Sequence, residues 1–363
     1  MRSQGAAGCL QLSTPSVKLE YPNDAEAHFE YIHHTLRPWL QNSTVPIPDG
    51  RVHTMLSANG FHGPWLENLW ISEGMARYAQ RRPGESMRDV FGPVVPIFLP
   101  WDDWWCAGQI RPHRANHIYP QGLVSALLAV LRPTVPYATV SMSDMGISGR
   151  PSDGLPMRRL PNVLVFSSGG YGHIPLPLLQ REQPAMPSVP MAARSHFVSY
   201  VGSLAHAPHN LRPRMLAIAN ETAARLGESA FFYKGSKWDS VVNDSRISLS
   251  PRGFGRSAYR TFEVLQMGRL PIVIHSDLPW VPYAGLFERV AWTSNLSALP
   301  ALLENLKRVP HAELERRERL ALSMRQTHWT WRGVLDQIFG FLNGTGSDLR
   351  CQPLPRAVIE VDS

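Results

Sequence analysis

The sequence predicts an α/β protein with parallel sheets, organised as two domains. Short apolar, β-branched runs alternate with helical segments along most of the chain, and strand–helix alternation of this kind implies a parallel sheet. The chain has 363 residues, which is long enough for two domains with sizeable cores. Gln180–Ala193 is rich in proline, lacks periodicity and lies between two such alternating runs, so it is the best candidate for a linker.

We expect residues 1–24 to be irregular and residues 25–180 to form the N-terminal domain. The expected helices of this half are Ala25–Gln41 (interrupted at Pro38), Leu66–Gln80 and Ile118–Leu131. The expected strands are Pro93–Leu99, Tyr137–Met142 and Asn162–Phe166.

We expect a linker at residues 181–193, a C-terminal domain at 194–345 and an irregular tail at 346–363. The expected strands are Phe197–Val201, Ala230–Lys234, Arg246–Ser250, Ile272–Ile274 and Arg289–Trp292. The expected helices are Asn210–Leu226, Ser257–Gly268, Ser297–Arg308, His311–Gln326 and Thr330–Leu342.

The stretch Leu249–Tyr283 carries the clearest chemical signal. A turn with two glycines and two arginines, Pro251–Arg256, follows a predicted strand and leads into a predicted helix. Ser257 is a suitable N-cap for that helix, and Gly268 is placed to end it. A glycine-rich loop before a helix N-terminus presents unpaired N–H groups and partial positive charge, so this stretch favours a bound diphosphate.

Three charged side chains share one side of this helix. Arg256 and Arg260 are four residues apart, so their guanidinium groups could converge on a phosphate, and Glu263 follows one turn later and could hold sugar hydroxyls. The alternative is an Arg–Glu pair on a solvated helix face. The spacing alone leaves both interpretations open.

The amino-acid composition indicates which kinds of ligand the protein could bind. The net charge is +7, and only four of the 36 basic residues are lysine. Arginine suits bidentate recognition of phosphate, although genome composition could produce the same bias. There is no long basic run and no zinc-finger spacing, which argues against nucleic acid. Asp102 and Asp103 are adjacent rather than spaced as a metal-binding pair, so we predict no metal.

Cysteines and glycosylation sequons bear on the compartment. Cys9, Cys106 and Cys351 lack metal-ligand spacing, and an odd number cannot all pair within the chain. Five Asn-x-Ser/Thr sequons are compatible with a secretory lumen; they begin at Asn42, Asn220, Asn243, Asn295 and Asn343. There is no apolar run of about 20 residues and no signal-peptide core near the N-terminus.

The stretch at 249–283 resembles the C-terminal part of the exostosin-like glycosyltransferases (glycosyltransferase family 47). That signature is Pro-x-Gly, an Arg three residues before a Glu, a Gly-x-x-Pro strand and a Leu-Pro-aromatic turn. The matching residues are Pro251–Gly253, Arg260 and Glu263, Gly268–Pro271–Ile274, and Leu278–Pro279–Trp280. Phe197–Arg212 is similar to the preceding strand–Gly segment. The likeness is fainter over 90–190, where Ser143 and Gly172 replace a His and an Asp of the family pattern.

The resemblance implies the GT-B fold, in which two Rossmann-like domains face a cleft. It also implies inverting, metal-independent transfer of a hexose or pentose from a nucleotide sugar, most simply a UDP-sugar as co-substrate, to a glycan or glycoprotein hydroxyl. The family implies the lumenal side of the Golgi apparatus, a type II membrane anchor that is not seen in this sequence, and homo- or hetero-oligomers with a related transferase.

The resemblance also assigns site residues. Arg212 matches the arginine after the strand–Gly segment, and the loop, helix and following turn are expected to bind the donor. The expected donor-binding residues are Arg212, Arg252, Gly253, Gly255, Arg256, Ser257, Arg260, Glu263, Asp277 and Tyr283. The general base should come from the N-terminal domain, with Asp144 as first candidate and His173 as second, each at the end of a predicted strand.

Two other classes stay open on the sequence alone. Because Ser143 and Gly172 depart from the family pattern, the chain could be an inactive relative that binds glycans or pairs with an active subunit. A dehydrogenase-like nucleotide enzyme is the other class, and the lack of Gly-x-Gly-x-x-Gly after an early strand counts against it.

Overall fold

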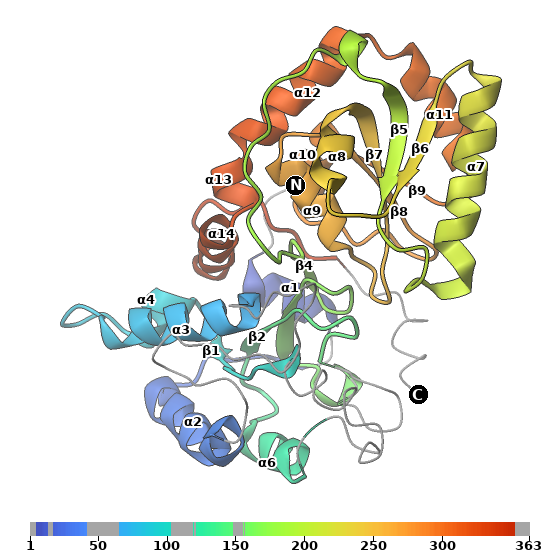
Figure 1. Cartoon of the computed structure of the whole chain (residues 1–363). Helices are drawn as coiled ribbons and strands as arrows, with labels where there is room; N and C mark the ends of the chain where they lie inside the picture. The colour runs from blue at the N-terminus through green and yellow to red at the C-terminus, as the bar shows by residue number, and fades with distance from the viewer. Residues whose placement is uncertain are drawn as a thin grey trace. The chain divides into compact units, whose positions relative to one another are not determined.

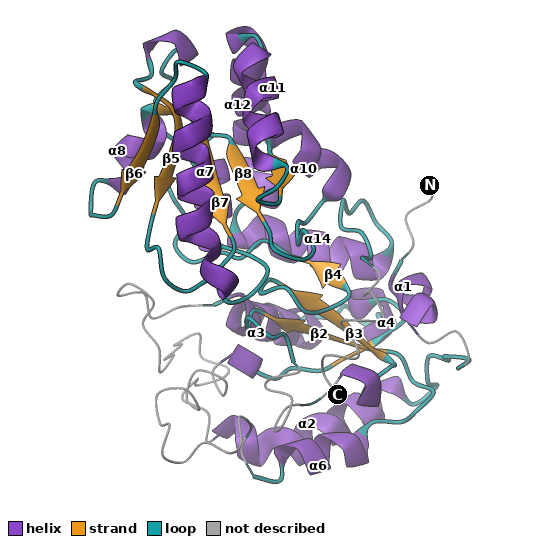
Figure 2. Cartoon of the chain, turned by 90° about the vertical axis from the view of Figure 1, so that its right-hand side faces the viewer, coloured by secondary structure: helices purple, strands orange, loops and turns teal. Residues whose placement is uncertain are grey.

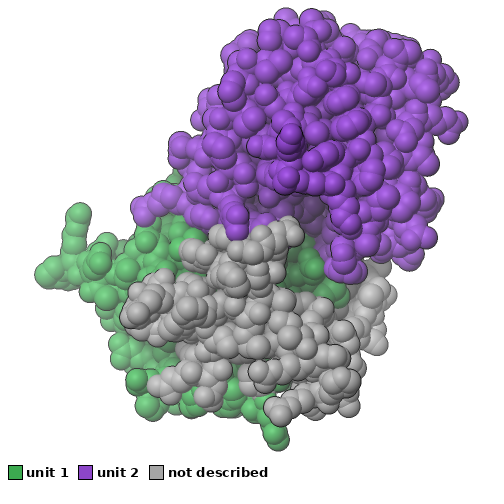
Figure 3. Space-filling view, in the orientation of Figure 1, with its two compact units in different colours: residues 1–176, 335–363 green, residues 177–334 purple. Residues whose placement is uncertain are grey.

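The chain forms two compact units in the computed structural model, which describes residues 5–13, 17–41, 65–102, 119, 121–147, 155 and 157–352. Unit 1 comprises Met1–Leu176 and Leu335–Ser363, and unit 2 comprises Pro177–Val334 (Figure 3). Each unit is built on a parallel sheet, so the predicted α/β class with two parallel sheets is confirmed. Asn42, Asp103 and Cys106 lie outside the described residues.

Unit 1 is a four-stranded parallel sheet in the order β1-β2-β3-β4. Its strands are β1 (Val95–Pro96), β2 (Tyr137–Ser141), β3 (Val163–Ser167) and β4 (Ile174–Pro175). Its helices are α1 (Ala6–Ser13), α2 (Ala25–Gln41), α3 (Leu66–Ala79), α4 (Met87–Phe91), α6 (Leu123–Val130) and the 3₁₀ turn η2 (Met157–Arg159). All residues of the four strands are buried, as expected for parallel strands covered on both faces.

The domain boundaries differ from the expected ones at both ends of the chain. Residues 335–345, expected in the C-terminal domain, group with unit 1 because Phe339 of helix α14 (Trp331–Asn343) packs on Trp70 and Phe91. The segment expected to be irregular at 1–24 contains helix α1. Pro38 lies inside α2, which continues to Gln41, so the expected interruption there is wrong.

A disulfide joins the two ends of unit 1. Cys9 of α1 is bonded to Cys351, 342 residues away in sequence. Cys9 and Leu10 are fully buried, which explains why a short N-terminal segment is ordered as a helix. Disulfides of this kind persist in oxidising compartments.

Replacing both Cys9 and Cys351 with serine should lower the free energy of unfolding by about 2–4 kcal/mol. The physical reason is that the bond closes a very long loop and so restricts the unfolded chain. The measurement is the melting temperature of the double variant, with and without reductant, beside the wild type. Equal melting temperatures for the oxidised wild type and the variant would contradict a stabilising bond.

Unit 2 is a five-stranded parallel sheet in the order β6-β5-β7-β8-β9. Its strands are β5 (His196–Val201), β6 (Ala230–Tyr233), β7 (Ser245–Pro251), β8 (Pro271–Ile274) and β9 (Trp292–Ser294). Its helices are α7 (Leu211–Arg225), α8 (Trp238–Asn243), α9 (Tyr259–Gln266), α10 (Ala284–Val290), α11 (Leu299–Arg308), α12 (His311–Ser323) and α13 (Arg325–His328), with 3₁₀ turns η3 (Met191–Ala193) and η4 (Pro208–Asn210). The strand expected at Arg289–Trp292 is wrong: α10 continues to Val290, and β9 begins at Trp292.

Helices cover both faces of this sheet (Figures 1 and 2). Helices α7 and α11 pack against each other and against strand residues such as Val198, Leu249 and Ile272 on one face. Helices α8 and α9 pack on the other face, where Val264 contacts the cluster around Val201. The adjacent residues Tyr200 and Val201 of β5 therefore enter different cores, as expected for neighbouring side chains of a strand. No helix among the described residues is long and apolar enough to span a membrane.

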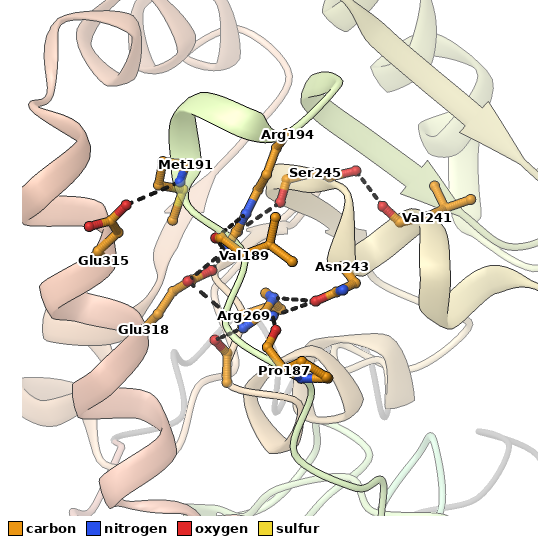
Figure 4. A network of polar contacts seen from close by, with 11 residues as sticks. Pro187, Val189, Met191, Arg194, Val241, Asn243, Ser245, Arg269, Glu315 and Glu318 are labelled. Carbon is orange, nitrogen blue, oxygen red and sulfur yellow. Dashed lines mark hydrogen bonds and ion pairs between the residues drawn. The ribbon is translucent and has the colours of Figure 1, made fainter.

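The stretch expected to be a linker is fastened to unit 2 (Figure 4). The fully buried Arg194 side chain forms two bonds of 2.7 and 2.8 Å to Glu318 of α12 and also donates to the Val189 carbonyl. Arg269 donates to the Pro187 carbonyl and to Asn243. Such a bidentate buried pair holds the chain in one path, so residues 187–194 belong to the body of unit 2.

Candidate functional site

The order of strands in unit 2 marks one place where a ligand is expected. The chain leaves β5 toward β6 on one side, returns to β7 on the other, and then continues outward to β8 and β9. In open parallel sheets of this order, ligands bind outside the carboxyl ends of the strands, at the point between the first and third strands. The loops that follow β5 and β7, residues 202–210 and 252–258, lie at that point.

Backbone strain lies at the same edge of the sheet. Among the described residues, four non-glycine residues have φ in the left-handed region: His206 (68°), His209 (54°), Asn210 (52°) and Tyr283 (53°). Three of them lie in the loop after β5, and the fourth lies in the loop after β8. Such conformations cost about 1–3 kcal/mol each for most residues, and they gather at functional sites. No motif or spacing in the sequence points to the two histidines.

Arg212 and Arg252 organise these loops from within. Arg212, in the first turn of α7, donates from Nη1 to the Ser203 and Ala205 carbonyls at 2.8 Å and from Nε and Nη2 to the Arg252 carbonyl. It thereby joins the loop after β5 to the loop after β7. Arg212 was expected to contact the diphosphate, and in this structure its donors serve backbone oxygens.

Asp277 links the loop with two glycines, Pro251–Arg256 (the glycine loop), to the loop after β8. Its two carboxylate oxygens accept from Arg252 Nη1 and Arg256 Nε, each at 2.7 Å. Burial alone would raise the pKa of Asp277, but the Arg256 hydrogen bond and the Arg252 charge outweigh it, so the pKa is lowered below 3.8. Together with Arg212, these groups sum to a formal charge of +2, which suits an anionic ligand.

The glycine loop is held in a fixed conformation. Arg252, which is 5% exposed, donates from Nε to the Gly255 carbonyl and from Nη2 to the Phe254 carbonyl. The Gly253 N–H donates to the Ser257 carbonyl at 3.0 Å. A Cβ on Gly253 would meet nothing closer than 3.6 Å, so there is room for a larger residue at this position. The absence of a side chain leaves the backbone of the loop accessible there.

Ser257 does not cap helix α9. The N-cap is Ala258, with extended backbone and no side-chain cap, because the loop closes through the Ser257 carbonyl before the helix begins at Tyr259. The predicted N-cap at Ser257 is therefore wrong by one residue, and the first turn of α9 has no side-chain cap.

Arg260 and Glu263 pair within a largely buried setting. Arg260 Nη1 lies 3.0 Å from Glu263 Oε2, and the side chains are only 20% and 12% exposed. The guanidinium also lies 3.8 Å above the Trp238 ring. Burial lowers the pKa of Arg260 and raises that of Glu263, and each charge partly offsets the effect on the other. The pair is thus not the solvated surface pair that was the alternative interpretation.

Part of the Arg260 side chain lacks a hydrogen-bond partner. Its Nε and Nη1 atoms are buried, yet neither has an acceptor within hydrogen-bonding geometry among the described residues. Buried guanidinium donors are normally satisfied, so each exception needs an explanation. One explanation is that an anionic group of a bound ligand accepts these hydrogen bonds.

Tyr283 lies in an aromatic cluster. It is 2% exposed and packs edge-on against His328 (4.7 Å between ring centroids) and Trp329 (5.5 Å). Its left-handed backbone turns the chain from the loop after β8 into α10. Packing is the role that the structure shows for this residue, and the donor contact stays a prediction.

Of the two candidate bases in unit 1, His173 is the less suited. It is 5% exposed, its Nδ1 accepts from the Val165 N–H at 3.0 Å, and burial lowers its pKa to about 4. Asp144 is half-buried in the turn that follows β2. Asp144 thus stays partly exposed at a strand end, where a general base could reach an acceptor hydroxyl, whereas His173 is buried and its Nδ1 accepts from a strand N–H.

The loop that contains Asp144 and the loop after β3 approach each other closely at glycine residues. A Cβ on Gly169 would lie 1.8 Å from the Ser143 carbonyl oxygen, and one on Gly146 would lie 2.1 Å from that of Tyr171. A Cβ on Gly172 would lie 2.7 Å from Ser167 Cβ. The family aspartate therefore could not be restored at Gly172 without a shift of the backbone.

Glu67 is a buried acidic residue that sequence reasoning missed. It is 2% exposed, and its carboxylate accepts from the Met142 N–H at 2.7 Å and from the Asp102 N–H at 2.9 Å. These two N–H groups follow β2 and the segment after β1, so Glu67 joins the carboxyl ends of neighbouring strands. Met142 is two residues before Asp144, so Glu67 fixes the chain that leads to the candidate base.

No described group of three or more His, Cys, Asp or Glu residues could hold a metal ion. Asp103 lies outside the described residues. Within the described residues, the positive charge of the site in unit 2 comes from arginines.

No family model and no curated protein matches the sequence. Among solved structures, TarM aligns with a TM-score of 0.36 and 7% identity, over 60% of this chain and 52% of that one. The GtfA/B complex aligns with a TM-score of 0.38 and 11% identity, over 67% of this chain and 61% of that one. The chain spans less than two-thirds of either protein, and at these scores neither likeness identifies a family or an activity.

Replacing Asp277 with asparagine should lower the melting temperature at neutral pH, because two buried arginines lose their shared carboxylate. The side chain is 38% exposed, so solvent screening reduces the expected loss to about 1–2 kcal/mol. Folding lowers the pKa of Asp277 below 3.8. The stabilisation by its carboxylate is therefore complete above pH 3.8 and is lost as the pH falls through the lowered pKa. The difference between variant and wild type should therefore shrink below about pH 4, whereas Glu288→Gln, at an exposed position on α10, should change little at any pH.

Proposed function

We propose that this protein is a glycosyltransferase that uses a nucleotide sugar, most simply a UDP-sugar, as donor and that it is related to the exostosin-like family. The observation that carries the proposal is the group of three arginines, Arg212, Arg252 and Arg256, around the two loops at the point between β5 and β7 of a parallel sheet. Their net positive charge suits a diphosphate, and the family-like Arg260–Glu263 spacing lies on the helix that follows.

The residues take distinct roles in this proposal. Arg256 and Arg260 stabilise the diphosphate that leaves the donor, while Arg212 and Arg252 hold the loops in place beforehand, so that little reorganisation is needed. Glu263 accepts hydrogen bonds from hydroxyls of the ribose or the donor sugar. Asp144 takes the proton from the acceptor hydroxyl, and attack from the face opposite the leaving group inverts the anomeric carbon. The acceptor is a glycan or a glycoprotein.

Binding and turnover test this proposal directly. The full chain should be stabilised by millimolar UDP and not by NAD in a thermal-shift measurement, and it should release UDP from a UDP-sugar when a suitable glycan is present. Activity should persist in EDTA, since arginines supply the charge. No stabilisation by UDP and no transfer from any nucleotide sugar would refute an enzyme of this class.

An inactive relative that binds glycans or joins an active subunit is the second candidate. The close approach around Gly172 favours it, because the family aspartate has no room there without a shift of the backbone. An inactive subunit should bind glycans on an array and co-purify with a related transferase, yet turn over no radiolabelled UDP-sugar. Turnover by the purified chain alone would exclude it.

The lumen of the Golgi apparatus is the proposed compartment. The Cys9–Cys351 disulfide supports it. So does the number of sequons: twelve asparagines, in a chain where 43 of 363 residues are Ser or Thr, would give only about one or two by chance. Asn220 on α7 and Asn295 before α11 are exposed, whereas Asn243 is bonded to Arg269.

A glycosidase that removes N-linked glycans should therefore increase the mobility of protein isolated from its own cells. Asn220→Gln and Asn295→Gln should each remove one glycan. Asn305→Gln, at an exposed asparagine of α11 that lies in no sequon, should remove none. Protein without any glycan would count against a lumenal site.

A further inference from the structure

Phe254 is an exposed apolar side chain in the glycine loop, whose backbone is held by hydrogen bonds. Phe254 is 63% exposed, the highest value among the large apolar side chains of the described residues. Its carbonyl accepts from Arg252 Nη2 at 2.9 Å, and the next carbonyl accepts from Arg252 Nε at 2.8 Å. The ring is therefore presented at a fixed place, although burying it would be favourable by about 1.5–3 kcal/mol.

The Phe254 ring has a partner on the neighbouring loop. The His206 ring contacts it edge-to-face, with centroids 5.4 Å apart and planes at 73°. His206 is exposed and has a φ of 68°, a conformation that is costly for histidine. Phe254 follows β7 and His206 follows β5, so this Phe254–His206 ring pair comes from the two strands that flank the expected ligand position.

The ring pair lies beside positive charge. Arg212 donates to the Ala205 carbonyl, next to His206, and to the Arg252 carbonyl, two residues before Phe254. Arg252 and Arg256 flank Phe254 in the loop itself. A ligand that fits both features has a flat ring at one end and an anionic group nearby, which is the chemistry of a nucleoside diphosphate.

We infer that the Phe254–His206 ring pair stacks on the nucleobase of the donor. This inference rests on the proposed function and deepens it, because it assigns the base to one loop surface. Stacking of a base on an aromatic side chain contributes about 1–3 kcal/mol and tolerates different bases. The ring pair therefore supplies affinity for a nucleoside, while selectivity for uracil has to come from other groups.

The chain offers a matched control in a second His–Phe pair. Phe231 of β6 is 36% exposed and stacks on His196, with centroids 4.3 Å apart and an interplanar angle of 1°. His196 is the first residue of β5, so this pair starts from the amino end of that strand. Ligands of parallel sheets bind at the carboxyl ends, and the Phe231–His196 pair should have no role in binding.

Calorimetric titration of the full chain with UDP and with inorganic pyrophosphate separates the ring from the phosphates. Phe254→Ala should weaken UDP binding by about five- to a hundredfold and leave pyrophosphate binding unchanged. Phe254→Trp, which keeps an aromatic face, should bind UDP like the wild type. Phe231→Ala should bind both ligands like the wild type, and circular dichroism of each variant confirms that it is folded.

The possible outcomes separate a failure of the stacking role from a failure of the proposed function. If the wild type binds UDP and Phe254→Ala binds it equally well, the stacking role is wrong and the proposed function stands. If Phe254→Ala weakens pyrophosphate as much as UDP, the ring only supports the loop. A loss seen with a UDP-sugar and not with UDP would assign the ring to the sugar instead of the base. No UDP binding by the wild type would overturn the proposed function and this inference together.

Discussion

Replacing Arg260 with methionine should weaken nucleotide-sugar binding by about ten- to a hundredfold. The expected loss corresponds to one charge-assisted hydrogen bond to a desolvated phosphate, about 1.5–3 kcal/mol. Arg260 is suited to this bond because its buried Nε and Nη1 atoms make no hydrogen bond to the described residues, although Nη1 forms an ion pair with Glu263. Arg260→Lys should also bind more weakly, since an ammonium cannot reproduce the planar guanidinium fork. Calorimetric titration with the donor measures both variants.

Stability has to be separated from binding in this experiment. Glu263 is 12% exposed, so Arg260→Met leaves a largely buried carboxylate without its partner and should cost about 3–5 kcal/mol of folding free energy. The double variant Arg260→Met/Glu263→Gln removes both charges and should recover most of that stability without recovering donor affinity. A double variant that binds the donor like the wild type would show that Arg260 serves only to neutralise Glu263.

The sequence was informative where local pattern decides the structure. Apolar runs predicted the five strands of unit 2 to within a few residues, except at β9. There, Arg289 and Val290 stay in α10, which buries Val290 and Phe287. Proline was a weaker signal than expected: α2 continues past Pro38 to Gln41, although the ring removes one N–H from the helix hydrogen bonds.

Side-chain roles at the site were less predictable than its position. The loop after β7 was recognised from its glycines and arginines, but Arg212 and Arg252 proved to bind carbonyls of their own and neighbouring loops. Spacing shows which charges can converge and does not show whether their partner is a ligand or the backbone. The Phe254–His206 pair and the left-handed histidines depend on loop conformations that no periodic pattern encodes.

Glu67 shows the same limit in unit 1. Its two backbone partners are 35 and 75 residues away in sequence, and its burial follows from the packing of α3 on β2. Nothing local to Leu66–Ala79 distinguishes it from an ordinary acidic residue in the first turn of a helix.

Replacing Glu67 with alanine should lower the free energy of unfolding by about 3–5 kcal/mol. The change removes two hydrogen bonds to a buried acidic group and leaves the Met142 and Asp102 N–H groups without their acceptor. Glu67→Gln should fall between the alanine variant and the wild type, because its amide oxygen can accept one of the bonds while its NH₂ faces the other N–H. Thermal unfolding of both variants measures the effect.

A matched control lies two turns further along the same helix. Glu73 pairs with Arg77 at 2.8 Å with both side chains partly exposed, so Glu73→Gln should cost only about 0.3–0.5 kcal/mol. If Glu67→Gln melts like Glu73→Gln, the two backbone bonds do not hold the ends of β1 and β2. If it melts as expected, its turnover tests the positioning of Asp144. Displacing the Met142 backbone should reduce kcat for acceptor transfer and leave donor affinity unchanged, because the arginines proposed to bind the diphosphate all lie in unit 2.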